Sequence, residues 1–304
     1  MLDKLEFLLV LARERHFGRA AEAAGVTQPT FSSAIKSLEE NLGTALVERG
    51  SRFRGFTPEG ERVLEWARRL VGDARTMRQE LQSLKGSLSG HLRIGAIPTA
   101  LPCVPDLTVP FHSRCPRVRL SVFSSTSADI LSKLENLEID VGISYIDNEP
   151  IGRLHSVPLY EEQYMLLVSS RNPLARFDKM TWSAAARLPL CLLTPDTQSR
   201  RIIDAVLQEN GGSCTPTFES NSMMTLFTHV RTGHWVSIIP ARLIDAVERP
   251  RQLKTIPLTS PNITKTIGLL IRGREPFAPA VSAFIGVAER VFKGLGHVPV
   301  PENA

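Results

Sequence analysis

The sequence predicts a small helical domain at the N-terminus, one long helix after it, and a C-terminal α/β domain. Residues 17–43 contain two short helical patterns separated by a glycine. A regular apolar spacing then runs from residue 63 to residue 84. Beyond residue 90, short strand-like runs alternate with helix-like stretches, which is typical of open, mostly parallel sheets with helices on both faces.

Size and charge set wide bounds on the function. At 304 residues the chain can hold about two domains, and its net charge of +5 is compatible with nucleic acid without requiring it. The first 60 residues carry eight arginines and lysines against eight acids, so phosphate contact there would depend on where single charges lie. The apolar N-terminal run contains Asp3 and Glu6 and no small-residue cleavage site, which favours an amphipathic helix over a signal peptide. With no stretch long enough to span a membrane, we expect a cytoplasmic protein and no membrane partner.

Residues 17–43 predict two helices joined by a tight turn. Ala20 and Ala21 let another helix approach closely, and Gly25 suits the left-handed position after a helix end. Thr27 is a good N-cap for the second helix, and Pro29 falls in its first turn, where a missing N–H costs little.

The second helix of this pair separates apolar from polar residues. A stripe of four apolar residues is expected to face the core: Phe31, Ile35, Leu38 and Leu42. The opposite face is small and polar and comprises Gln28, Pro29, Thr30, Ser32, Ser33 and Lys36. Such a face can reach base edges in a major groove about 12 Å wide. The alternative is an ordinary solvated face.

Two further patterns follow this unit. The segment ALVERGSRFRGFTP predicts a short hairpin, whose Arg49, Arg52 and Arg54 would contact phosphates or merely aid solubility. Thr57-Pro58-Glu59 predicts a helix start. The helix that follows has an apolar seam at alternating spacings of four and three residues: Val63, Ala67, Leu70, Ala74, Met77, Leu81 and Leu84. We expect this seam to pack against a second copy of the chain, the alternative being its own chain.

The N-terminal region resembles the winged helix-turn-helix of LysR-type transcriptional regulators. The matching residues are Phe17, Ala20, Ala21, Thr27, Gln28, Pro29, Ser32, Ile35, Leu38, Glu39, Leu42, Gly43, Leu46, Arg49, Thr57 and Gly60. Val47, Phe56 and Pro58 depart from the family pattern, apolar for apolar. The resemblance implies sequence-specific binding of double-stranded DNA, a small-molecule effector, and a homo-oligomer that dimerises through the linker helix and is expected to be a tetramer. RNA polymerase is a further candidate partner.

The C-terminal region also matches this family, at G-x-I-P-T after its first strand and at residues 134–143 and 230–240. The resemblance implies a periplasmic-binding-protein-like α/β domain of two subdomains with a ligand between them. The predicted domains are a winged helix-turn-helix at 1–58, a linker helix at 59–86 and an effector-binding domain at 91–304. Subdomain I would comprise 91–161 and 266–304, and subdomain II 162–265.

Candidate effector residues follow from the rule that ligands bind beyond the carboxyl ends of parallel strands, near helix N-termini. The rule selects Pro98, Thr99, Ala100, Ser124, Ser125, Thr126, Ser127, Ser144, Tyr145, Thr194 and Gln198. All of these except Ser124, Ser127 and Tyr145 are taken as candidate effector residues. Hydroxyl groups at helix starts suit a small anion such as a carboxylate, although they can equally be simple caps. Thr99 and Thr126 also match the family's effector pocket. Arg200 and Arg201 could bind an anion, but adjacent arginines on a helix are usually solvated.

The sequence offers little support for a metal site, a redox site or a catalytic site. The cysteines Cys103, Cys115, Cys191 and Cys214 show no metal spacing and are expected to be core residues. A redox-sensing pair is the alternative, since one branch of the resembling family uses one. No catalytic motif is present, so we expect neither an enzyme nor a cofactor. The rival interpretation is a solute-binding or sensory protein whose helical head docks a protein partner.

Overall fold

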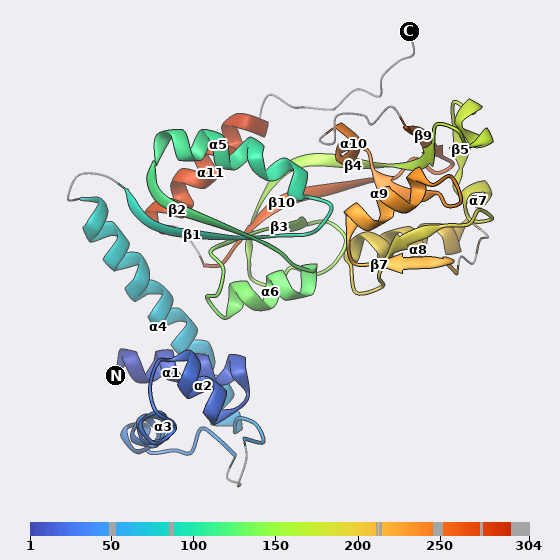
Figure 1. Ribbon diagram of the computed structural model, residues 1–304. Coiled ribbons are helices and arrows are strands. Elements are labelled where there is room, and N and C mark those ends of the chain that lie inside the picture. The colour runs from blue at the N-terminus through green and yellow to red at the C-terminus, as the bar shows by residue number, and fades with distance from the viewer. Residues whose placement is uncertain are drawn as a thin grey trace. The chain divides into compact units, whose positions relative to one another are not determined.

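The computed structural model describes residues 1–48, 53–84, 88–210, 212, 215–245, 252–273 and 276–292 (Figure 1). The chain divides into two compact units, residues 1–87 with 135–138 and residues 88–134 with 139–304. No helix in the described part of the chain is both long and apolar enough to cross a membrane.

The first unit contains helices α1 (Leu2–Glu14), α2 (Phe17–Ala23), α3 (Gln28–Leu42) and α4 (Pro58–Ser83). Thr27 caps α3 by accepting the N–H of Thr30, and Gly25 adopts a φ of 69° in the turn before it, as the sequence predicts. Phe31, Ile35 and Leu38 are buried. The prediction for Leu42 is wrong, because this side chain is 37% exposed in the last turn, beyond the reach of the core.

A row of aromatic rings, one pair stacked and the others edge-to-face, joins the helices to the hairpin, and the sequence pattern does not reveal it. Phe31 lies 5.1 Å from the ring of Phe7 and 6.2 Å from that of Phe17. Phe53 continues the row, at 6.3 Å from Phe17 and 5.1 Å from Phe56. Since α1, α2, α3 and the hairpin each supply a ring, the cluster fixes their mutual positions.

The structure describes the predicted hairpin only at its base. Val47 and Phe56 form a single antiparallel bridge, and the N–H of Glu48 donates to the carbonyl of Gly55. Its tip, with Arg49, Gly50 and Arg52, lies outside the described residues. Thr57 then caps α4, because its Oγ1 accepts the N–H of Gly60 at 2.9 Å.

Helix α4 has two apolar faces rather than one seam. Leu64, Ala67 and Val71 are fully buried in the core of the first unit, where α4 packs against α1. A second set remains exposed, and we call it the outer face of α4: Trp66, Leu70, Met77, Leu81 and Leu84. Ala67 therefore belongs to the intramolecular contact, and Trp66, which the heptad pattern omitted, takes its place on the outer face.

The second unit is built on a mixed sheet in the order β2-β1-β3-β10-β4-β9-β5, with β8 also paired to β4. Its strands are β1 (Ser89–Ala96), β2 (Arg117–Ser124), β3 (Val141–Tyr145), β4 (His155–Ser169), β5 (Met180–Thr181), β8 (Ser237–Pro240), β9 (Leu253–Thr259) and β10 (Thr264–Ile271). A separate pair joins β6 (Cys191–Leu193) to β7 (Phe218–Ser220). The helical elements are η1 (Leu101–Cys103), α5 (Val104–Arg114), α6 (Ser127–Glu135), η2 (Pro173–Arg176), α7 (Trp182–Ala185), α8 (Gln198–Glu209), α9 (Met223–Arg231), α10 (Arg242–Asp245) and α11 (Pro279–Phe292).

The expectation of mostly parallel strands holds only in part. Strand β1 is parallel to β2 and β3, but β10 runs antiparallel to β3 and β4, and β4 runs antiparallel to β8 and β9. We call β1–β3, β10, α5, α6 and α11 the first lobe, and β5–β9 with α7–α10 the second lobe. The predicted residue boundaries of two subdomains remain a prediction.

Strand β4 serves both lobes. Residues 155–163 pair with β10, and residues 164–169 pair with β8 and β9. The apolar run YMLLVSS at 164–170 predicts only its second part, because Glu161, Glu162 and Gln163 interrupt the apolar pattern before it. No strand pattern marks β5, which is two residues long, or β9, which contains Pro257.

Candidate functional site

The polar face of α3 is solvent-accessible along its whole length. We call Gln28, Pro29, Thr30, Ser32, Ser33 and Lys36 the reading face; all are exposed except the half-buried Ser32. Lys36 lies 3.9 Å from Glu40 in an exposed i,i+4 pair. Because such a pair is weak in water, the ammonium group can exchange Glu40 for a phosphate.

Two polar contacts hold α3 in place, and the sequence analysis assigned neither. The ammonium of Lys4 in α1 donates to Ser37 Oγ at 2.7 Å. Glu39 Oε1 accepts the N–H groups of Leu46 at 2.7 Å and Val47 at 3.1 Å, which fixes the start of the hairpin on α3. Glu39 had been noted only as a family match, and its structural role needed the tertiary contact to be visible.

Of the three predicted phosphate contacts, only Arg54 can be located. Its side chain is exposed on the returning arm of the hairpin, next to Phe53. Arg49 and Arg52 lie outside the described residues. The reading face and Arg54 together present amide, hydroxyl and cationic groups, which are the groups that contact bases and phosphates.

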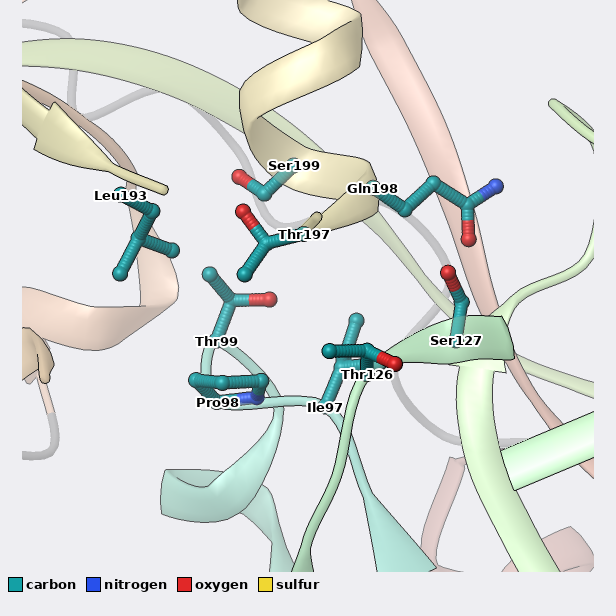
Figure 2. A pocket seen from close by; sticks show the side chains of 9 residues that line it. All are labelled: Ile97, Pro98, Thr99, Thr126, Ser127, Leu193, Thr197, Gln198 and Ser199. Carbon is teal, nitrogen blue, oxygen red and sulfur yellow. The ribbon is translucent and has the colours of Figure 1, made fainter. Parts of the chain in front are cut away.

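The second unit contains a small hollow between its lobes, whose volume of about 10 Å³ is room for about one water molecule (Figure 2). It is lined by Ile97, Pro98, Thr99, Thr126, Ser127, Leu193, Thr197, Gln198 and Ser199. Four predicted effector residues therefore line it: Pro98, Thr99, Thr126 and Gln198. These residues follow β1 and β2 or begin α8, so the strand-end rule located the hollow correctly.

The other four predicted residues do not line this hollow. Ala100 is fully buried, and Ser125 Oγ accepts a hydrogen bond from Lys133 at 2.8 Å. Ser144 is 1% exposed, and the carbonyl of Thr194 accepts the N–H and the hydroxyl of Thr197. Ser127, which the strand-end rule selected although it was not among the eight candidates, also lines the hollow. Four lining residues were missed: Ile97, Leu193, Thr197 and Ser199. Each is adjacent in sequence to a residue that was selected, so widening each helix start by one residue would have found them.

A buried hydroxyl in the hollow lacks a hydrogen-bond partner. Thr99 is 3% exposed, yet no described group bonds its Oγ1. Leaving such a group unsatisfied costs about 1–3 kcal/mol. The hollow therefore contains a polar atom that a ligand could satisfy.

A buried polar network lies on β3 and β4. The hydroxyl of Tyr145 donates to Glu162 Oε2 at 2.6 Å and lies 3.1 Å from the hydroxyl of Tyr164. Burial raises the pKa of Glu162 to about 8, although the hydrogen bond from Tyr145 and the charge of Arg242 act in the opposite direction. Glu162 is therefore largely protonated at neutral pH. Tyr164 connects this network to Ser199 in the hollow.

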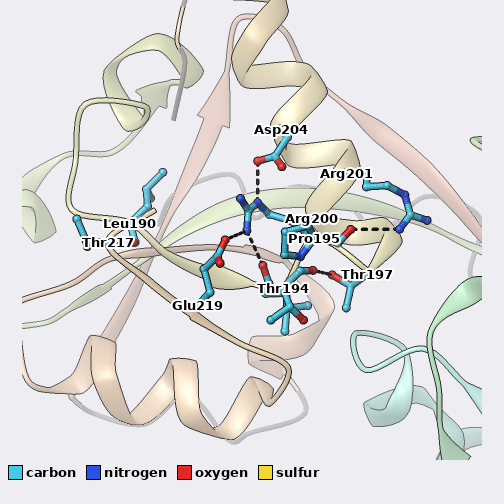
Figure 3. Close-up of polar contacts among 10 residues, drawn as sticks. Leu190, Thr194, Pro195, Thr197, Arg200, Arg201, Asp204, Thr217 and Glu219 are labelled. Atoms are coloured by element: carbon cyan, nitrogen blue, oxygen red, sulfur yellow. Dashed lines mark hydrogen bonds and ion pairs between the residues drawn. The ribbon is translucent and has the colours of Figure 1, made fainter. Parts of the chain in front are cut away.

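The expectation that Arg200 and Arg201 are solvated is wrong for Arg200. Its side chain is only 6% exposed, and Figure 3 shows its guanidinium between Asp204 and Glu219. It also donates to the carbonyl of Leu193 at 2.8 Å. Arg200 thus fixes α8 to β6 and β7, which is a structural task.

Arg201 makes different contacts. Its guanidinium forms two parallel bonds with Glu149, Nε to Oε1 at 2.8 Å and Nη2 to Oε2 at 2.9 Å. It also donates to the carbonyl of Asp196 at 2.8 Å, and its Nη2 lies 3.4 Å from Ser127 Oγ. A second ion pair joins the lobes elsewhere, between Arg242 in α10 and Asp106 in α5 at 2.9 Å.

None of the described cysteines lines the hollow. Cys103 and Cys191 are buried, and burial raises their pKa values to about 12 and about 11. Burial also raises the pKa of Cys115. Raised pKa values make thiols poor nucleophiles. Cys103 and Cys191 are core residues, as predicted, whereas Cys115 is only half-buried. Cys214 lies outside the described residues.

Comparison with known proteins matches both units. Residues 2–61 match the family "Bacterial regulatory helix-turn-helix protein, lysR family", and residues 85–293 match "LysR substrate binding domain". The DNA-binding transcriptional dual regulator OxyR of Escherichia coli K12 is 28% identical over 288 residues, covering 94% of this chain and 93% of that protein. The uncharacterized HTH-type transcriptional regulator YfeR of Shigella flexneri is 27% identical, covering 93% and 91%.

Solved structures agree with these matches. A full-length OxyR variant from Pseudomonas aeruginosa has a TM-score of 0.76 and 27% identity, covering 99% of each chain. The full-length regulator CbnR complexed with its target DNA has a TM-score of 0.60 and covers 96% of this chain and 99% of that one. At 19% identity, the likeness to CbnR shows the fold alone.

Proposed function

The chain belongs to the LysR family of bacterial transcription regulators, and we propose that the reading face of α3 recognises its operator while the hollow binds its effector. As a member of this family it is a DNA-binding transcription regulator with an effector-binding domain. The match to both parts of the family favours this function over the rival of a sensory protein with a protein-docking head.

The exposed reading face is the observation that carries the DNA-binding proposal. Gln28 can pair bidentately with adenine, and the small residues Ser32 and Ser33 let the helix approach the groove floor. Arg54, with Arg49 and Arg52, would contact phosphates. The absence of net charge in the first 60 residues means that each head binds weakly alone, which favours an oligomer.

The outer face of α4 supports a dimer. Its large apolar residues lie on one side of the helix and remain 48–82% exposed in a single chain. Burial against the same face of a second copy would remove them from water and set the spacing of two reading faces. We propose a dimer of this kind, assembled further into a homotetramer, with RNA polymerase as a further partner.

The hollow supports a small effector with hydrogen-bonding groups. At about 10 Å³ the hollow has room for about one water molecule, so the lobes must move apart before an effector of several heavy atoms can enter. Several relatives are named hydrogen peroxide-inducible genes activators. Because no described cysteine lines this hollow, we propose reversible recognition of a small anion, a carboxylate foremost, rather than thiol oxidation there.

Three smaller proposals complete this function. The protein is not an enzyme, so a bound effector should be recovered unchanged. It acts in the cytoplasm, where its DNA lies. Its domains are the winged helix-turn-helix at 1–58, the linker helix at 59–86 and the effector-binding domain at 91–304, with subdomains divided at 161/162 and 265/266.

The decisive experiment substitutes Ser33→Arg in the middle of the reading face. We expect loss of operator binding in a mobility-shift assay with the oligomer intact, because the bulky side chain keeps α3 out of the groove. Gln252→Arg, which adds the same charge on an exposed position of the second unit, should bind the operator normally. Unchanged affinity in Ser33→Arg would assign recognition to another surface.

A further inference from the structure

We propose that Arg201 is the receptor for an effector carboxylate, and that the carboxylate of Glu149, its present partner, competes for that place. This inference rests on the proposed function, because it names the group of the effector site that would bind the anion. It also gives Glu149 a role as a built-in competitor that an effector must displace.

The geometry of Arg201 is that of a carboxylate receptor. Nε and Nη2 face the two carboxylate oxygens of Glu149 at 2.8 and 2.9 Å, the paired arrangement in which arginine recognises carboxylates. Nη1 donates to the carbonyls of Asp196 and Pro195 at 2.8 and 3.3 Å. These carbonyls belong to the loop before α8, so they hold the guanidinium in place when the carboxylate changes.

The receptor borders the hollow. Nη2 of Arg201 lies 3.4 Å from Ser127 Oγ, and Ser127, only 4% exposed, lines the hollow. Gln198, three residues before Arg201 on α8, lines it too (Figure 2). An anion on Arg201 would thus lie beside Ser127, which lines the same hollow as Gln198 and the unpartnered hydroxyl of Thr99.

Glu149 is suited to be displaced. It lies in the segment between β3 and β4, and the side chains of Glu149 and Arg201 are 36% and 37% exposed. An ion pair this open to water is weak, so a ligand that adds contacts in the hollow can replace it. Glu149 lies in the segment that joins β3 to the first-lobe part of β4, whereas Arg201 lies in the second lobe. Displacing Glu149 would therefore break one ion pair between the lobes.

The pair formed by Arg242 and Asp106 provides the matched control. It also joins an arginine of the second lobe to an acid of the first, at 2.9 Å, but neither residue lines the hollow. If Glu149 acts only by tying the lobes together, removing Asp106 should have the same effect as removing Glu149. If Glu149 competes with a ligand, only its own removal should change ligand affinity.

The test uses the full chain and three probes, sodium acetate, succinate and benzoate, against sodium chloride at equal ionic strength. Binding is read from the saturable rise of the thermal midpoint of the second unit. Glu149→Gln should lower the half-saturating concentration of at least one probe about tenfold, because a competing state no longer reduces the binding-competent fraction. Arg201→Gln should raise that concentration at least about tenfold, and Asp106→Asn should leave it within about twofold.

Arg201→Lys guards against a folding artefact. It keeps the charge but loses the paired geometry, so it should bind the probe between wild type and Arg201→Gln. Equal binding by wild type, Arg201→Gln and Arg201→Lys would overturn the inference, as would the absence of a saturable response in both wild type and Glu149→Gln. If Thr99→Val loses the response while Arg201→Gln keeps it, the hollow binds the effector and only the role of Arg201 is refuted. If both variants keep the response, the proposed effector site fails as well.

Discussion

The reading face and the hollow are built in opposite ways. The reading face comes from one helix, with its cap and its apolar stripe within residues 27–42. The hollow is assembled from the ends of β1, β2 and β6 and the start of α8, which lie up to a hundred residues apart in sequence. A site on one helix depends on that helix and its support, whereas an assembled site depends on how both lobes are held. Substitutions should therefore affect the two sites independently.

The largest expected effect comes from Gly60→Ala. A Cβ at this position would lie 2.0 Å from the carbonyl oxygen of Leu46, which is backbone and cannot yield easily. We expect a loss of about 3 kcal/mol from the first unit and a severe loss of DNA binding. Calorimetry of the full chain should show the transition of the first unit lowered and that of the second unchanged. A joint shift of both transitions would contradict the independence of the two sites.

Leu70→Glu should have the next largest effect, because it places a charge in the centre of the outer face of α4. We expect monomers by light scattering and a fall in operator affinity of at least about 100-fold, since two linked heads bind far more tightly than one. Gln82→Glu adds the same charge on another side of the exposed helix and should leave the dimer intact. A Leu70→Glu protein that remains fully oligomeric would assign dimerisation elsewhere.

Glu162→Gln should change how the second unit responds to pH. The folded state raises the pKa of Glu162 from 4.5 to about 8, so its stabilising contribution is complete below 4.5 and is lost as pH rises toward 8. The slope from this group is about 1.4 kcal/mol per pH unit at most. Glu162→Gln should remove that slope between pH 5 and 8 in thermal unfolding. Glu161→Gln, on the exposed side of the same strand, should retain it.

The smallest effect is expected from Thr99→Val. Removing the unpartnered hydroxyl should leave the free energy of unfolding unchanged or raise it by up to ~1 kcal/mol, while abolishing the response to an effector. Thr108→Val loses a hydroxyl that donates to the carbonyl of Val104, so it should destabilise slightly and leave effector binding intact. Stability changes in the reverse order would show that Thr99 is held by a partner within the protein.

The same contrast explains which residues of the two sites could be predicted from the sequence. Thr27, Pro29 and the apolar spacing of α3 act locally, so the reading face could be predicted almost residue by residue. The strand-end rule found Thr99, Thr126 and Gln198 because it too is local to each strand. Arg201 could not be assigned, because its partner Glu149 lies 52 residues away and no spacing rule links them. The burial of Glu162 could not be predicted either, because it depends on its hydrogen bond with Tyr145, 17 residues away in sequence.

The continuity of β4 limits what insertions the second unit can tolerate. Side chains alternate between the faces of a strand, so one added residue in its middle would turn every later side chain to the opposite face. Residues 155–163 belong to one lobe and 164–169 to the other, where both faces of the strand are buried: Leu166 and Val168 pack in one core and Leu167 in another. The shift would therefore exchange side chains between these two cores while leaving the first lobe correctly aligned. The length of this strand thus keeps the side chains of both lobes on their correct faces, and insertions can change it only in steps of two residues.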